Sequence, residues 1–182
     1  MARYIEKDRA AVRVSEPGRD PMDGFFALAP TTPLRDGPET ILDLLNSKQR
    51  VVPFIHGEDR TVLLLTRLNI DWVMAGPGVD RDHVCPRNYI VTREERVQVS
   101  FLDGRVIEGL IQMELPEDFN RASDFLNGTD DFFPLVTRLG TLIVNKARVR
   151  ETLVFETSPR PAVQNAAAAS AAQPAVRDSA RG

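Results

Sequence analysis

The residue types that most often perform catalysis or bind metal ions are few in this sequence, and their spacing does not fit such chemistry. The 182 residues include two His and one Cys. His83 and Cys85 follow Asp80 and Asp82, and all four side chains can bind zinc, but one H-x-C pair without a second well-spaced pair does not make a four-ligand site. The sequence has no G-x-x-x-x-G-K-S/T, no G-x-G-x-x-G after a strand and no H-E-x-x-H. We therefore expect no catalytic site, no cofactor and no bound metal.

Two Asp–Asn pairs are the other polar residues that recur. Asp43 and Asn46 are matched by Asp124 and Asn127, so the pairs could form a ligand site repeated about a pseudo-twofold axis. Asp is also favoured at the start of a helix, and Asn is favoured at its end. We favour this structural interpretation, in which each pair marks the limits of a short helix.

Paired arginines offer a possible phosphate-binding chemistry. The segment Arg93-Glu94-Glu95-Arg96 precedes a predicted strand and resembles the paired arginines of PilZ-type cyclic dinucleotide receptors, which hold phosphates. Such receptors also carry D-x-S-x-x-G after the next strand, and residues 118–128 do not supply it. We interpret Arg93 and Arg96 as part of a solvated charged segment, with a nucleotide-sensing module as an alternative.

Charge and hydropathy limit the classes of partner. The chain has 23 Lys and Arg against 26 Asp and Glu, a formal net charge of −3. This balance argues against nucleic acid as the main partner, because nucleic acid attracts excess cationic charge. The longest apolar runs fall far short of the roughly 20 residues of a membrane-spanning helix, and the N-terminal segment lacks a secretory apolar core. We expect a cytoplasmic protein that does not insert into a membrane.

Similar segments occur in the same order in the two halves of the chain. VRVS at residues 12–15 recurs as VQVS at 97–100, DLLN at 43–46 as DFLN at 124–127, and LLLTR at 63–67 as LIVNK at 142–146, with offsets of 85, 81 and 79 residues. The small differences in offset fall in segments that read as loops. The pattern predicts duplication of one folding unit.

The second copy shows the expected elements of the unit most clearly. Residues 96–102 alternate between apolar and polar, Asp103-Gly104 suits a tight turn, and residues 105–113 form the partner strand. Residues 123–128 predict a helical turn, capped by Ser123 and ended by a left-handed Asn127-Gly128. Three further strands follow at 132–136, 141–145 and 148–155. Pro134 favours an edge strand or a bulge.

The first copy has the same later elements and a different beginning. Residues 39–46 predict a helix with Pro38 near its first position, followed by strands at 50–55, 61–66 and 70–74. Two prolines within residues 16–21 are expected to blunt the first hairpin, because proline cannot donate to a ladder.

These elements predict a mainly β protein with short helices (α+β), built from two tandem small SH3/Sm-like β-barrel units packed with pseudo-twofold symmetry. Trp72 and Met74 are the expected contact between the units. The predicted organisation is a flexible N-terminus (1–9), a first β repeat (10–75), a linker (76–94), a second β repeat (95–157) and a disordered Ala/Pro-rich tail (158–182).

The run VQVSFLDGRVIEGLIQMELPEDFNRASDFLNGTDDFFPL, followed by LIVNKARV, resembles an uncharacterised bacterial small β-domain family with a D-F-L-N, F-x-P-L and V-N-K pattern. The resemblance covers residues 96–155, and the first copy from Glu39 onward. More distantly, the pattern resembles Sm-like or SH3-type barrels. The family motifs are structural, so the resemblance implies no catalytic role.

We therefore expect a non-catalytic protein-interaction or regulatory module, whose partner is another protein. The strands that contain Pro53 and Pro134 are the predicted docking edges, and Trp72, Arg93 and Arg96 are further candidate contact residues. The alternatives are an Sm-like nucleic-acid-binding protein and a PilZ-like nucleotide-sensing module. Homo-oligomerisation is left open.

Overall fold

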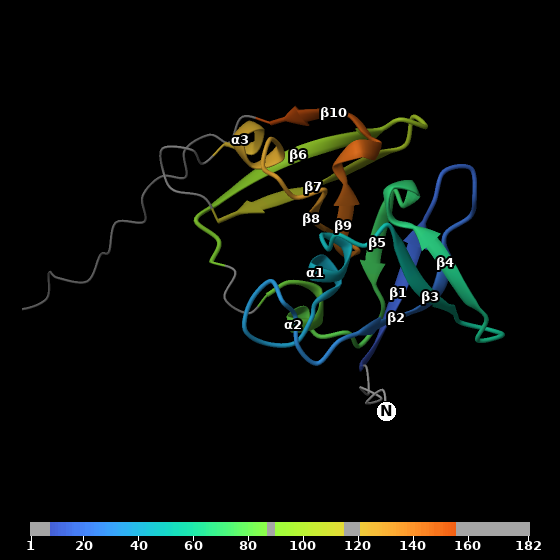
Figure 1. The fold of residues 1–182 in the computed structure, drawn as a ribbon. Helices are drawn as coiled ribbons and strands as arrows, with labels where there is room; N and C mark the ends of the chain where they lie inside the picture. Colours follow the sequence, from blue (N-terminus) through green and yellow to red (C-terminus); the bar gives the residue numbers. More distant parts are fainter. Residues whose placement is uncertain (1–7, 87–89, 115–120, 156–182) are drawn as a thin grey trace, which may run out of the picture.

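The computed structural model describes residues 8–86, 90–114 and 121–155, and it is mainly β (Figure 1). Ten antiparallel strands of the described residues form one sheet, accompanied by three short α-helices. The elements are β1 (Asp8–Ser15), β2 (Met22–Leu28), α1 (Ile41–Leu45), β3 (Val51–His56), β4 (Val62–Thr66), the 3-10 helix η1 (Arg67–Asn69), β5 (Trp72–Ala75), α2 (Arg81–Val84), β6 (Arg93–Phe101), β7 (Val106–Met113), α3 (Ala122–Leu126), β8 (Phe132–Thr137), β9 (Gly140–Asn145), the 3-10 helix η3 (Lys146–Arg148) and β10 (Val149–Val154).

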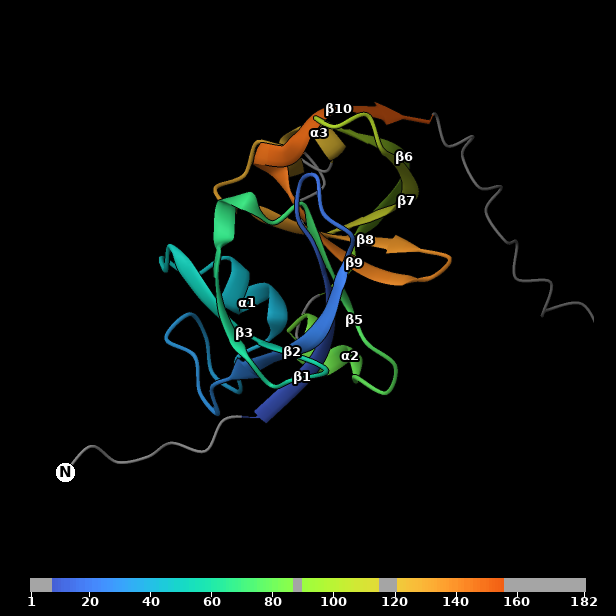
Figure 2. The ribbon, with the colours of Figure 1, turned by 90° about the vertical axis from the view of Figure 1, so that its right-hand side faces the viewer.

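The strand order is β10-β6-β7-β8-β9-β5-β1-β2-β3-β4. The first half of the sheet, β1 to β5, has the internal order β5-β1-β2-β3-β4, and the second half, β6 to β10, has the internal order β10-β6-β7-β8-β9. Pairing of β5 with β9 joins the two halves, which are stacked one above the other in Figure 2. Among the described strands, β4 and β10 have one neighbour each, so the sheet is not closed and these two strands are its edges.

The registers of the two halves agree with the offsets found in the sequence. One pair from each strand pairing of the first half illustrates this with its counterpart in the second: Val12↔Gly24 and Val97↔Gly109, Phe25↔Ile55 and Leu110↔Val136, Pro53↔Leu64 and Pro134↔Ile143, Val14↔Val73 and Val99↔Thr152. Positions related by these offsets are called corresponding positions below.

Gly24 and Gly109 occupy corresponding positions where neighbouring strands approach closely. A Cβ atom on Gly24 would lie 2.3 Å from the carbonyl oxygen of Ile55, and a Cβ atom on Gly109 would lie 2.7 Å from that of Val136. Contacts this short require the backbone to move. Both sites therefore need glycine because of the approach of the next strand.

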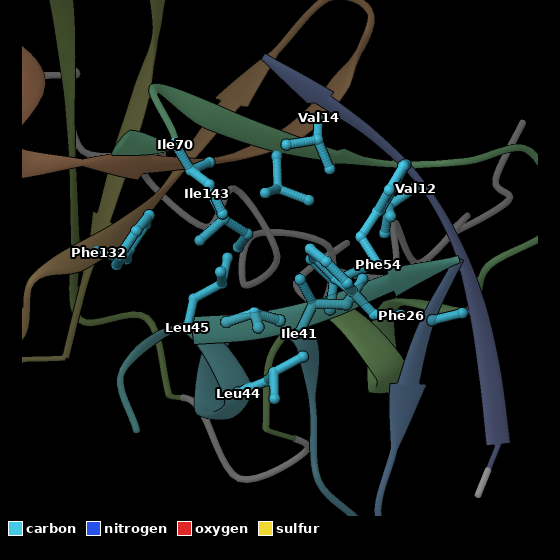
Figure 3. Packing of buried hydrophobic residues seen from close by; sticks show 14 of the residues in the cluster. Val12, Val14, Phe26, Ile41, Leu44, Leu45, Phe54, Ile70, Phe132 and Ile143 are labelled. Carbon is cyan, nitrogen blue, oxygen red and sulfur yellow. The ribbon is translucent and has the colours of Figure 1, made fainter. Parts of the chain in front are cut away.

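Two clusters of buried apolar side chains form the core, and each receives residues from the other half. The first cluster contains side chains of β1 to β5, together with Phe132 and Ile143 from the second half (Figure 3). Trp72 and Met74 of β5 pack against the second cluster, and they lie opposite Val144 and Leu142 of β9. The prediction that Trp72 and Met74 contact the other half is confirmed.

The helical turn α3 forms near the predicted position with different ends. It begins at Ala122 with Arg121 as N-cap, and Ser123 lies inside the helix, so the predicted Ser123 cap is wrong. The carboxylate of Glu95 on β6 accepts a hydrogen bond from the Ala122 N–H (3.0 Å) and supplies the cap from a distant strand. Asn127 has φ −80° and ψ −5°, so the predicted left-handed ending is also wrong.

Two predictions for the first half are corrected in the same way. The N-cap of α1 is Thr40, which forms a capping box with Asp43, so Pro38 lies before the helix and not in its first turn. The prolines at positions 17 and 21 lie in the loop between β1 and β2, and these strands still pair over seven positions. The hairpin is therefore not blunted.

The prediction that Pro53 and Pro134 mark edge strands is wrong. Strand β3 lies between β2 and β4, and β8 lies between β7 and β9. Both prolines are tolerated because neither is paired with the preceding strand. The pairing of β3 with β2 ends at Phe54, and the pairing of β8 with β7 ends at Leu135, so each proline lies one residue outside that ladder.

The predicted segment boundaries differ slightly from the observed elements. Strand β1 starts at Asp8, and the predicted linker contains the helix α2. Residues 1–7 and the predicted tail at 158–182 lie outside the described residues. Within the described residues, no helix has the length and apolar character needed to cross a membrane.

Candidate interaction surfaces

A polar network holds the two halves together beside the β5–β9 pair. The carboxylate of Asp71, which is 1% exposed, accepts a hydrogen bond from Nε of Arg148 (2.9 Å) and forms an ion pair with Arg105. Nη1 of Arg105 also donates to the Ser15 hydroxyl (2.7 Å). Because Asp71 and Ser15 belong to the first half and both arginines to the second, the network crosses the junction.

Amide side chains complete this junction. Oδ1 of Asn46 accepts from the Phe132 N–H (2.8 Å), and Nδ2 of Asn46 donates to the Phe132 carbonyl (3.0 Å). The buried Asn145 donates through Nδ2 to the carbonyls of Leu68 (3.2 Å) and Ile70 (2.8 Å). Each amide thus pairs with the backbone of the other half, as an extra strand residue would.

A second ion pair crosses the junction near α1. Nη1 of Arg67 donates to Asp131 (2.6 Å) and to the Leu45 carbonyl (2.9 Å), and the guanidinium lies 5.9 Å from the Phe132 ring centroid. The sequence pattern indicates Asn46 only as a helix end and gives no signal for Arg67, Asp71, Arg105 or Asn145. These residues carry no local motif, since their partners across the junction are 34 to 90 positions away.

Strand β4 is an open edge with an apolar outer face. Its sequence is VLLLT, and Val62 and Leu64 are 57% and 69% exposed. Val51 and Pro53 of the adjacent β3 are also exposed, and Pro53 lies opposite Leu64. This surface, formed by Val51, Pro53, Val62 and Leu64, is called the β4 face.

Strand β10 is the other open edge, and a groove lies beside it. The groove has a volume of about 430 Å³ and is lined by α3, η3 and β10, including Leu126, Asn127, Lys146, Val149 and Thr152. It is called the β10 groove. Its lining combines apolar side chains with the charged residues Lys146, Arg150 and Glu151.

The structure does not bring Arg93 and Arg96 together. Along β6, Glu95 and Val97 face the interior, and Arg93 and Arg96 lie on opposite faces because side chains alternate along a strand. Each arginine already has a carboxylate partner: Arg93 pairs with Glu95 (2.8 Å), and Arg96 with Glu108 (2.9 Å). The two guanidinium groups therefore do not form a clamp for one phosphate.

Arg96 lines a second groove, of about 340 Å³, between β6, β7 and β8. Its guanidinium carbon lies 4.9 Å from the ring centroid of Phe155. The groove also contains Arg138 in the β8–β9 turn. The positive charge of the two arginines in this groove is partly neutralised, because the Glu108 carboxylate also lines it.

The residues with possible metal or nucleophilic chemistry have structural partners. Cys85 follows α2 and is buried, and this burial raises the pKa of its thiol to about 11, which keeps it protonated at neutral pH. Asp43 pairs with Arg35 (2.7 Å) in addition to capping α1. Across the described ranges, no three His, Cys, Asp or Glu side chains gather where they could hold a metal ion.

Comparison of the chain with protein-family models, with curated proteins and with solved structures gave no match.

Proposed function

We propose that this protein is a non-catalytic protein-interaction module, built from two tandem copies of one SH3-like or Sm-like small β unit that pack together with pseudo-twofold symmetry. The shared strand order, the corresponding registers and the matching close-approach glycines support a duplication. In each half a 3-10 helix connects the fourth strand to the fifth, which supports the same unit.

The open β4 edge is the observation that carries the proposal. An edge strand presents unpaired N–H and C=O groups, and natural edges are protected by charged residues, prolines or bulges. The five residues of β4 include none of these devices, and two of their outward side chains, Val62 and Leu64, are apolar and exposed. A partner that adds a strand to this edge would satisfy the backbone groups and cover the β4 face.

Capture from a native lysate with matched variants tests this function. Leu64→Asp places a charge in the β4 face, whereas Leu139→Asp makes the same change at a leucine that is 87% exposed in the β8–β9 turn. We expect a stoichiometric protein to be recovered with the wild type and with Leu139→Asp, and to be lost with Leu64→Asp. A binding assay with the purified partner should give the same result, with binding by the wild type and by Leu139→Asp and loss of binding for Leu64→Asp.

Nuclease treatment separates this function from nucleic-acid binding. Protein binding at the β4 face should survive nuclease and depend weakly on salt. Recovery that disappears with nuclease, or that is equal for Leu64→Asp and the wild type, contradicts the proposed function.

A further inference from the structure

We propose that the β4 face binds the β10 edge of a second copy of this chain, so that copies associate head to tail. This inference rests on the proposed function and names its partner. The contact inside the chain, where β5 of the first half pairs with β9 of the second, is the template. Strand β10 corresponds to β5, and β4 corresponds to β9. The two strands left open at the ends of the sheet are therefore the counterparts of the two strands that already pair at its centre.

Apolar side chains that bridge the internal junction have exposed counterparts. Phe132 and Ile143 of the second half fill the space beside Leu45 and Ile70 of the first half (Figure 3). The residue corresponding to Phe132 is Val51, which is 42% exposed. The counterpart of Ile143 is Leu64. Both lie on the β4 face, where they can pack into the corresponding space of another copy.

That matching space is the β10 groove. Leu126 and Val149 correspond to Leu45 and Ile70, and Thr152 corresponds to the buried Val73. In the first half these positions are covered by the second half, whereas in the second half they line an open groove of about 430 Å³. A second copy would place Val51 and Leu64 there, as Phe132 and Ile143 are placed inside the chain.

The same amide recurs at both contacts. Asn46 pairs with the N–H and C=O of Phe132 across the internal junction. Its counterpart, Asn127, is exposed at the β10 groove, and the counterpart of Phe132 is Val51 of the β4 face. Asn127 can therefore make the same two hydrogen bonds to the Val51 backbone of another copy.

The main ion pair of the internal junction also has a counterpart at the proposed contact, where the positions of the acidic and the basic residue are exchanged. Inside the chain, Asp71 of the first half pairs with Arg105 of the second. The corresponding residues are Arg150, which lies at the register shift of β10 between Val149 and Glu151, and Asp20 in the β1–β2 loop, and both are exposed. The contact between copies would thus join Arg150 of one copy to Asp20 of the next.

Two features of the proposed contact are less favourable than their counterparts at the internal junction, and they lower the affinity between copies. The internal pair of Arg67 and Asp131 corresponds to Lys146 and Arg50, which repel each other. Glu151 stands at the position of Trp72. The association between copies should therefore be weaker than the internal junction and should depend on protein concentration. Because the contact joins two different surfaces, it generates rings if the rotation closes and open chains if it does not.

Sedimentation velocity of the full chain at increasing concentration, up to about 1 mM, tests the inference. We expect the average mass to rise with concentration for the wild type and for Leu139→Asp. Leu64→Asp should remain monomeric. Arg150→Asp and Asp20→Arg should each raise the dissociation constant by about tenfold or more, because each places like charges together. Equal melting temperatures confirm that the variants fold.

Restoring the pair gives the decisive result. The double variant Asp20→Arg/Arg150→Asp should associate like the wild type, and an equimolar mixture of the two single variants should associate more tightly than either variant alone. A wild type that stays monomeric, or single variants that associate normally, overturns the inference. If the wild type is monomeric while Leu64→Asp still abolishes capture of a cellular protein, the inference fails and the proposed function stands. If Leu64→Asp alters neither self-association nor capture, both fail.

Discussion

Phe132→Ala tests whether the two halves fold as one body. Phe132 belongs to β8 of the second half, yet its ring is 1% exposed and packs in the first apolar cluster (Figure 3). Replacing a fully buried phenylalanine by alanine costs about 3–5 kcal/mol of unfolding free energy, from lost burial and the cavity left behind. The ring also lies 5.9 Å from the guanidinium of Arg67, an attraction that the variant loses.

The loss should appear as a lower melting temperature of the whole protein. For a domain of this size, each kcal/mol lowers the melting temperature by about 2–4 °C, so the expected decrease is about 6–20 °C. Chemical denaturation should be followed by the fluorescence of Trp72, the single tryptophan, and by far-ultraviolet circular dichroism. Trp72 reports on the β5–β9 junction and circular dichroism on the complete sheet, so both signals should shift together.

Phe125→Ala is the matched control. The Phe125 ring is only partly buried, and it lies edge-on to Phe133 with the ring centroids 6.3 Å apart. The expected cost is therefore smaller, about 1–2 kcal/mol. A larger loss for Phe125→Ala than for Phe132→Ala, or separate transitions for the two signals in the wild type, would refute the argument for a shared core.

Three further predictions concern single positions. Gly24→Ala should destabilise the protein by about 2–3 kcal/mol because its Cβ would meet a backbone oxygen at 2.3 Å, whereas Gly104→Ala, with φ +87° and free space around it, should cost about 1 kcal/mol; equal losses in urea denaturation would show that the close approach is unimportant. The Cys85 thiol, with its pKa raised by burial to about 11 from 9.0, should react with a thiol reagent at pH 8 about a hundredfold more slowly than a free thiol, and fast labelling of the folded protein would contradict its burial. Asp71→Asn should cost about 2 kcal/mol, because the partly exposed guanidinium groups of Arg105 and Arg148 lose their anionic partner; an unchanged denaturation midpoint would remove the junction network from the stabilising contacts.

Local patterns predicted the strands of the second half well. The alternation in VQVSF places Val97, Val99 and Phe101 inside, and all three are fully buried. The helix ends were predicted poorly because their hydrogen-bond partners are distant in sequence. Glu95, which caps α3 from β6, lies 27 positions before Ala122, and a search for local capping residues cannot find it.

The candidate surfaces were harder to predict than the fold for a related reason. Sequence similarity between the two halves marks positions where they agree, such as Asn46 and Asn127, and misses positions where they differ. Asp71 and Arg150 carry opposite charges, so sequence similarity between the two halves does not mark them. Only the strand order shows that these residues occupy equivalent places at a closed junction and at an open edge.

The exchange of charges between the two contacts bears on how the correct pairing is selected. If β10 of another copy displaced β5 from β9, Arg150 would lie beside Arg105. If β5 of another copy added to β4, Asp71 would lie beside Asp20. Both wrong pairings bring like charges together, whereas the internal pairing and the proposed head-to-tail pairing each join opposite charges. The difference between the two halves at these positions therefore favours one intramolecular and one intermolecular arrangement, which two identical halves could not distinguish.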